Sequence, residues 1–327
     1  MTDFTVVVLK GAYSSSVAVT LDILSAASSI APRNGAPAPT WRVCSPSGGL
    51  VELGPGMSVQ TEKLGLVGLD RSVWIIPGLA LNTEAAVQQS VHRPDVVCLS
   101  EMIAAHIKAG GRVAACCSAV FLLQFAGVLS GRRVTTTWWL APLLQRFNPA
   151  AVVDAGRMVC ADGPIVTGGA AFAQTDLMIH LLREQCGAKV VDSITRVLLI
   201  DARQAQGAYI VPEVLANGDE LVSRLVARIE SSLPEPPGVA QLAREFCVSE
   251  RTLARHVRKT TGHSTIALLQ SVKLRKARAL LEQSRFSVDQ VAAAVGYSDS
   301  TALRRLMKKV NGSSPSKFRP NKHAVSI

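Results

Sequence analysis

Two hydrophobic patterns divide the chain into a front part and a back part. In roughly the first 200 residues, short continuous apolar runs alternate with longer segments of helical spacing, as in 6–9 before 17–27, 73–76 before 101–109, and 113–116 before 120–125. Apolar residues that fill a strand without alternating indicate a parallel sheet covered on both faces. The pattern therefore predicts an α/β fold for the front part.

The last third of the chain contains one unit twice, and each copy has the pattern of a helix, a tight turn and a second, arginine-bearing helix. The first halves of the copies match at an offset of 49 residues and the second halves at an offset of 50. The pairs in the first half are Val239 with Val288, Gln241 with Gln290, Leu242 with Val291, Ala243 with Ala292, Phe246 with Val295, Ser249 with Ser298, and Glu250 with Asp299. Because charged and apolar positions recur together, the back part is predicted to be an all-α double helix-turn-helix domain.

The second copy carries each local signal of this motif. Ser287 and Gln290 have the spacing of a capping box, Gly296 permits a sharp turn, and Asp299 places a negative charge at the start of the next helix. Apolar positions at helical spacing are assigned to two cores: Leu242, Ala243, Phe246, Leu253 and Val257 in the first copy, and Leu303, Leu306 and Met307 in the second.

Double-stranded DNA is the partner that the outer faces of these helices predict. Arginine can make two hydrogen bonds to guanine, and lysines near helix ends suit phosphate contacts that fix the register. Lys259 and Lys308 are the phosphate candidates. The candidates for the groove are Arg251, Thr252, Arg255 and Arg258 in the first copy, and Ser300, Thr301, Arg304 and Arg305 in the second.

A single helix over 266–283 is predicted between the copies. Its 18 residues would span about 27 Å at ~1.5 Å per residue. We expect such a spacer to place two recognition helices in successive major grooves, roughly 34 Å apart.

The charge of the chain is concentrated in the back part. Residues 220–327 contain 19 Lys and Arg against 8 Asp and Glu, whereas residues 1–219 contain 16 of each. The net charge of +11 therefore belongs to the segment with the repeat. A neutral front joined to a basic back is the asymmetry expected when one part of a protein approaches phosphate.

Residues 239–320 resemble the DNA-binding domain of AraC-family transcription regulators. The resemblance rests on the stretches 249–255, 291–299 and 312–315 and on Phe318 and Arg319. It implies that 249–259 and 299–309 are recognition helices, with Arg251, Thr252, Arg255, Thr301, Arg304 and Arg305 at base-reading positions. The chain departs from the family pattern at Cys247 (usually Gly), at Thr265 (usually Pro), and at Leu303 and Met307 (usually aromatic).

In the front part, the stretch 110–121 suggests a chemical site. A strand runs into a sharp turn with Cys117 at its apex, and a helix follows at once. A thiol at a helix N-terminus is expected to have a lowered pKa, which would make it a nucleophile or an anion neighbour. Together with 75–78, 127–134 and 165–169, this stretch resembles the class I glutamine amidotransferase-like, PfpI-type domain, a flavodoxin-like parallel-sheet sandwich. Its fusion to the double helix-turn-helix domain resembles the GlxA-type branch of AraC regulators.

The catalytic residues of that fold are incomplete in this chain. Thr137 stands where the family has a histidine, Ser16 aligns with the position of an acid, and Ala119 replaces a glycine; Asp22 lies about one turn beyond Ser16. Because a cysteine nucleophile normally needs a base, we expect no enzyme activity. The alternatives are a cysteine-dependent amide hydrolase fused to a DNA-binding domain, and an architectural DNA binder whose front part serves only pairing.

The residues that remain predict a small-molecule site at the carboxyl ends of the strands. Its expected members are Cys117, Ser118, Ser16, Gly78, Thr137 and Trp138. Trp138 and Trp139 are read either as an aromatic wall that holds a cation or as core residues, and Cys117 as either a sensing or a structural residue. By resemblance, the effector is an amino acid, an amine or a quaternary ammonium compound.

These patterns predict a domain at 1–202 that senses a ligand and dimerises, a linker at 203–237, and the DNA-binding domain at 238–320. The linker is expected to contain a helix over 219–231 before a proline run at 234–237; the alternative assigns this helix to the back part. The seven scattered cysteines and the few histidines show no metal spacing, so neither a metal nor a cofactor is expected. With neither a leader nor a spanning segment in the pattern, we expect a cytoplasmic protein without membrane contact. The resemblance adds a homodimer and, if the protein is an activator, contact with RNA polymerase.

Overall fold

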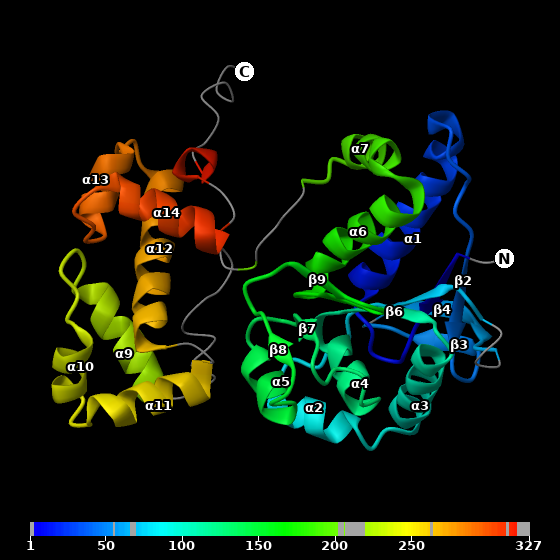
Figure 1. Cartoon of the computed structure of the whole chain (residues 1–327), viewed down its shortest axis with the longest axis horizontal. Helices are drawn as coiled ribbons and strands as arrows, with labels where there is room; N and C mark the ends of the chain where they lie inside the picture. Colours follow the sequence, from blue (N-terminus) through cyan, green and yellow to red (C-terminus); the bar gives the residue numbers. More distant parts are fainter. Residues whose placement is uncertain are drawn as a thin grey trace. The chain divides into compact units, whose positions relative to one another are not determined.

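The computed structural model describes residues 3–54, 56–65, 70–201, 206, 220–261, 264–311 and 314–318. The chain divides into two compact units, Met1–Gln204 and Ala205–Ile327 (Figure 1). Each unit has its own hydrophobic cores, and the two are described separately.

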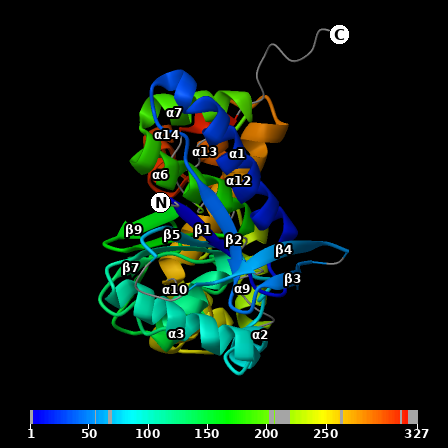
Figure 2. The ribbon, with the colours of Figure 1, turned by 90° about the vertical axis from the view of Figure 1, so that its right-hand side faces the viewer.

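The described part of the front unit is built on an eight-stranded sheet in the order β3-β4-β2-β1-β5-β6-β10-β9. The central pairs are parallel, and only the outer pairs β3–β4 and β9–β10 are antiparallel. Figure 2 shows β3 and β4 at one edge and β9 at the other. The strands are β1 (Phe4–Val7), β2 (Trp41–Ser45), β3 (Gly49–Glu52), β4 (Ser58–Lys63), β5 (Val73–Ile76), β6 (Arg112–Cys116), β9 (Val159–Asp162) and β10 (Ile165–Gly168), with a separate pair β7 (Arg133–Val134) and β8 (Val152–Val153).

Helices cover both faces of this sheet, which confirms the predicted parallel α/β fold (Figure 1). One face is covered by α1 (Ser14–Ile30), α6 (Gln174–Cys186) and α7 (Ala188–Val197). The other face is covered by α2 (Glu84–Ser90), α3 (Pro94–Lys108), α4 (Val120–Phe125) and α5 (Ala141–Phe147). Helix α3 begins earlier than the apolar spacing at 101–109 suggested, because Pro94 occupies its first turn, where a missing N–H has no cost.

The largest fully buried side chain of the front unit is Trp74 on β5, and its ring stacks on that of His106. The ring centroids are 4.1 Å apart and the planes differ by 9°. Burial lowers the pKa of His106, and the charge of Asp70 only partly opposes this. The folded protein therefore favours a neutral imidazole inside its core.

The back unit consists of helices that form two small cores. The first core is built from α9 (Glu220–Ser231), α10 (Val239–Glu245), α11 (Glu250–Thr261) and the first half of α12 (Thr265–Gln283). The second is built from the rest of α12, α13 (Val288–Ala294), α14 (Ser300–Asn311) and the short turn Pro315–Phe318. The two helix-turn-helix units and the single helix between them are confirmed.

Helix α9 corresponds to the helix expected over 219–231 in the linker segment, and it packs in the first core, as the alternative assignment to the back part has it. Four of its side chains, Val222, Leu225, Val226 and Ile229, are fully buried there. Arg228 on α9 pairs with Glu245 at 2.7 Å, and Glu230 pairs with Arg275 at 2.7 Å. Apart from Gln206, residues 202–219 lie outside the described part of the chain, as do the last residues of the predicted DNA-binding domain.

The tight turns of the two helix-turn-helix copies have the same backbone conformation. Cys247 and Gly296 occupy equivalent positions of the repeat, with φ of 54° and 77°. A left-handed conformation favours glycine and costs another residue roughly 1–2 kcal/mol. At Gly296, an added Cβ would also lie 3.0 Å from the carbonyl carbon of Pro234 and collide with its oxygen.

We expect the front unit to lose stability as the pH falls below about 6.5, the pKa of an unfolded histidine. Below this pH the histidine of the unfolded chain binds a proton, whereas buried His106 stays neutral in the folded protein. The free energy of unfolding therefore falls by at most about 1.4 kcal/mol per pH unit from this group. Urea unfolding followed by tryptophan fluorescence measures this, because all four tryptophans lie in the front unit. His106→Phe should flatten the dependence and His92→Gln, at an exposed site, should not; identical slopes for all three proteins would contradict the argument.

The two turns should respond in opposite directions to substitution. We expect Gly296→Ala to destabilise the second helix-turn-helix copy by about 2 kcal/mol or more, through the left-handed backbone and the collision with Pro234. Cys247→Gly should stabilise the first copy by about 1 kcal/mol. Amide hydrogen exchange of peptides from 239–261 and 288–311 reports the stability of each copy separately. Gly238→Ala, where an added Cβ meets nothing within 4 Å, is the control, and equal protection in all variants would refute the assignment.

Candidate DNA interface and ligand site

The second helix of each repeat buries one face and exposes the other. Leu253 and Val257 of α11, and Leu303 and Met307 of α14, are fully buried. Leu303 and Met307 thus serve as core residues in place of the usual aromatics. The charged candidates lie on the opposite side of each helix, as the spacing predicts.

All ten candidate DNA-binding residues lie on α11 or α14. Thr252 and Ser300, in the first turns, are partly buried. The exposed members are Arg251, Arg255, Arg258, Lys259, Thr301, Arg304, Arg305 and Lys308.

Side-chain caps hold the first turns of both helices. The Ser249 hydroxyl oxygen accepts a hydrogen bond from the Thr252 N–H at 3.1 Å and donates one to Thr252 Oγ1 at 2.9 Å. In the second copy, Asp299 Oδ1 accepts from the N–H groups of Thr301 and Ala302 at 2.6 and 3.0 Å. These backbone hydrogen bonds lower the pKa of Asp299. The predicted capping box of α13 is also present, with both hydrogen bonds between Ser287 and Gln290.

Three arginines on helices α9 and α12 form ion pairs: Arg228 with Glu245, Arg275 with Glu230, and Arg278 with Glu282. Within the described residues, none of the exposed cations on α11 and α14 forms an ion pair. Their charges remain available to phosphates and base edges.

In the front unit, Cys117 is positioned by the end of β6. It follows the strand with φ of 60°, begins a short 3₁₀ turn and leads into α4. The Thr136 hydroxyl donates a hydrogen bond to the Cys117 carbonyl oxygen at 2.8 Å. The predicted sharp turn with a cysteine at its apex is confirmed.

The expectation of a lowered thiol pKa is wrong. Cys117 is fully buried, and burial raises its pKa to about 11, because hydrogen bonds from Ser118 and Ala171 do not compensate for lost hydration. Ser16, at the position of an acid, is uncharged, and Asp22 is exposed. The thiol is therefore neutral at physiological pH.

The structure brings Ser16, Gly78 and Cys117 together. A Cβ added to Gly78 would lie 2.9 Å from Cys117 Cβ and 3.3 Å from Ser16 Oγ, so only glycine fits between them. The Ser16 hydroxyl donates to the Ala171 carbonyl at 3.2 Å, and the Ser118 hydroxyl donates to the Leu79 carbonyl at 2.5 Å. Both hydroxyls thus tie the site to neighbouring loops.

Thr137 and Trp138 complete the set expected to bind a ligand. Thr137 is fully buried, and its hydroxyl has no hydrogen-bond partner among the described residues. Trp138 is 7% exposed and lies edge-to-face with Trp139, with ring centroids 5.1 Å apart. Trp139 donates its indole N–H to the Asn82 carbonyl at 3.2 Å. All six residues of the expected ligand site are buried, and binding a ligand there stays a prediction.

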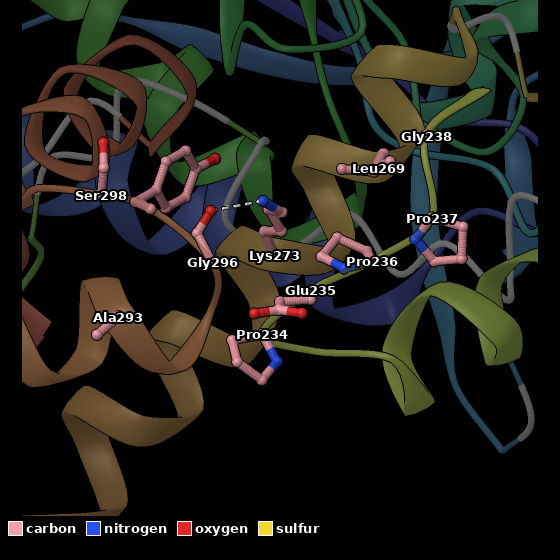
Figure 3. A pocket seen from close by; sticks show the side chains of 11 residues that line it. Pro234, Glu235, Pro236, Pro237, Gly238, Leu269, Lys273, Ala293, Gly296 and Ser298 are labelled. Atoms are coloured by element: carbon pink, nitrogen blue, oxygen red, sulfur yellow. Dashed lines mark hydrogen bonds between the residues drawn. The ribbon is translucent and has the colours of Figure 1, made fainter. Parts of the chain in front are cut away.

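A pocket of about 560 Å³ lies in the back unit, where the sequence suggested no site. The segment 234–238, helix α12 and the turn 296–298 line it (Figure 3). Lys273 donates a hydrogen bond from Nζ to the Gly296 carbonyl at 2.9 Å. No local pattern marks Lys273 as a site residue, because the proline segment that faces it is 36 to 39 residues away in the chain.

The described residues include no helix that is long and apolar enough to cross a membrane. Nor do they bring together three or more His, Cys, Asp or Glu side chains in a group that could hold a metal ion.

Comparison with known proteins matches both units. The model of a helix-turn-helix domain matches residues 242–321, and that of the DJ-1/PfpI family matches residues 87–184. In structure, the chain is similar to DJ-1beta of Drosophila melanogaster, with a TM-score of 0.50 and 19% identity, over 62% of this chain and 100% of that one. This likeness shows the fold alone.

Two curated relatives carry a regulator's name. The HTH-type transcriptional regulator GlxA of Rhizobium meliloti (strain 1021) is 29% identical over 212 residues, which cover 62% of this chain and 65% of that protein, slightly less than two thirds of its length. The HTH-type transcriptional regulator GbdR of Pseudomonas aeruginosa is 25% identical over 265 residues, covering 75% and 71%. The chain therefore combines a helix-turn-helix domain with a domain of the DJ-1/PfpI family, and it is similar to regulators of the AraC type that have this architecture.

Proposed function

We propose that this protein is a sequence-specific, DNA-binding transcription regulator controlled by a small metabolite. The observation that carries the proposal is the duplicated unit whose second helices expose cations that no described carboxylate pairs with. The names of the relatives GlxA and GbdR support it. Arg251, Thr252, Arg255, Thr301, Arg304 and Arg305 are proposed to read bases; Arg258, Lys259, Ser300 and Lys308 are proposed to contact the duplex beside them.

The spacer helix supports reading of two adjacent half-sites by one chain. Helix α12 has 19 residues, which span about 28 Å at ~1.5 Å each. Successive major grooves on one DNA face lie roughly 34 Å apart. A homodimer of such chains would read this pair of half-sites twice, and an activator would also contact RNA polymerase.

We propose that the front unit binds the effector near Cys117 rather than converting it. Gly78, Ser16, Ser118, Thr137 and Trp138 would surround a ligand that opens or reshapes this buried site. An effector changes DNA binding only by its different affinity for two arrangements of the protein. The neutral thiol and the absence of a base at Thr137 support a binding role over the alternative of a cysteine-dependent amide hydrolase.

Selection of binding sites from random DNA at fixed salt tests the DNA-binding role. We expect a motif with two half-sites about one helical turn apart. Arg255→Ala should weaken binding to this motif by about 1–3 kcal/mol and relax one base position. Lys259→Ala should weaken binding to all sequences alike and reduce the salt slope by about 1.

Arg33→Ala, at an exposed site of the front unit, serves as the control for charge and should leave DNA binding unchanged. Equal losses on specific and random DNA for both Arg255→Ala and Lys259→Ala would refute the assignment of roles. Weak binding without sequence preference in the wild type would refute the regulator itself.

Thiol alkylation tests the role of Cys117. At pH 8, a pKa of about 11 leaves on the order of one thiol in a thousand ionised, so Cys117 should resist iodoacetamide in the native protein. Exposed Cys98 and Cys247 should react first, and all cysteines should react in the unfolded chain. Mass spectrometry of the peptides measures the order. Fast native modification of Cys117, with loss of a measurable amide-cleaving turnover, would favour the hydrolase.

A further inference from the structure

Lys273 places a positive charge in the pocket of the back unit. Lys273 projects from α12 with Nζ 2.9 Å from the Gly296 carbonyl oxygen and 4.8 Å from the centre of the Tyr297 ring (Figure 3). These two partners satisfy part of an ammonium group, which has three protons to donate. In the part of the chain that the structure describes, no carboxylate forms an ion pair with Lys273.

A second donor in the same pocket is also unused. Tyr297 is one of the lining residues, and its hydroxyl is shielded from solvent without a hydrogen-bond partner among the described residues. A buried hydroxyl left unpaired has lost its hydration without gaining a partner. Burial also lowers the pKa of Lys273, since nothing nearby compensates for lost hydration. A negatively charged acceptor in the pocket would satisfy the remaining protons of the Lys273 ammonium group, beside the Tyr297 ring.

The other residues that line the pocket limit the charge and the shape of a ligand with such an acceptor. Rings of Pro234, Pro236 and Pro237 and the side chain of Leu269 supply apolar surface. Glu235 lines the same pocket and is exposed, so a second negative charge on the ligand would be repelled. The volume of about 560 Å³ is within the usual range for small-molecule sites.

We propose that this pocket binds a small organic monocarboxylate with a flat apolar body. Its carboxylate accepts a hydrogen bond from Lys273 Nζ beside the Tyr297 ring, and its body packs against the proline rings. The site lies in the DNA-binding unit itself, where the proline segment meets the turn before α14. The effect of the ligand on DNA binding rests on the proposed function, but the binding itself does not.

Tyrosine-labelled protein gives a direct test with benzoate as the probe. The full chain has only three tyrosines, at 13, 209 and 297, so ring labelling with carbon-13 gives three signals, and Tyr297→Phe identifies the one at the pocket. We expect benzoate to shift the Tyr297 signal with a Kd on the order of millimolar. Benzamide, which is neutral, and phthalate, which is doubly charged, should bind at least several-fold more weakly.

Three variants sharpen the result. Lys273→Met should weaken benzoate about tenfold or more, whereas Lys276→Met, at an exposed position of the same helix, should leave it unchanged. Glu235→Gln should improve phthalate binding several-fold, and this exposed substitution serves even if the Lys273 variant unfolds. The proposal is overturned if Tyr297 does not respond to benzoate, if benzamide binds as tightly, or if neither Lys273→Met nor Glu235→Gln changes the affinities. If the wild-type protein binds benzoate as expected but does not bind specific DNA, only the proposed function is refuted, and the proposal about the pocket stands.

Discussion

The DNA-binding unit depends on one helix that takes part in two cores. Leu268 and Val272 of α12 pack in the first core, while Leu274, Ala277 and Leu281 pack in the second. Each core alone contains few buried side chains, and small cores are marginally stable. Because the helix is continuous, it both completes the two cores and fixes the separation of α11 and α14. The stability of the two cores and the separation of these helices are therefore set by the same residues.

Local signals made much of this unit predictable. The capping box at Ser287, the acid at Asp299 and the glycine at 296 act within one turn of the chain, and the structure contains each of them. The buried strands of the front unit were equally predictable from the sequence, because continuous apolar runs such as 73–76 and 113–116 have few other interpretations. Less apolar strands at the sheet edges, such as β3 and β4, give no such signal, because exposed positions there need not be hydrophobic.

Where the sequence misled, the cause was long-range packing. The pKa of Cys117 depends on burial by Gly78, Ala171 and their neighbours, and this desolvation outweighs the helix start that the local pattern revealed. Likewise, the pocket around Lys273 exists because the carbonyl of Pro234 approaches the side-chain-free face of Gly296. The positions of the groove-facing arginines were predictable from spacing, but only the structure separates arginines engaged in ion pairs from those that are not.

The packing of α9 shows that the folding unit that contains the repeat begins before the repeat itself. Four of the ten fully or nearly fully buried side chains in the first core come from a helix that precedes the repeat. A recombinant fragment cut at residue 238 would leave an apolar groove on α10, α11 and α12 facing water. If DNA-binding units of this kind are exchanged between different sensing domains during evolution, the module that transfers intact begins at Glu220, and natural recombination points should fall before α9.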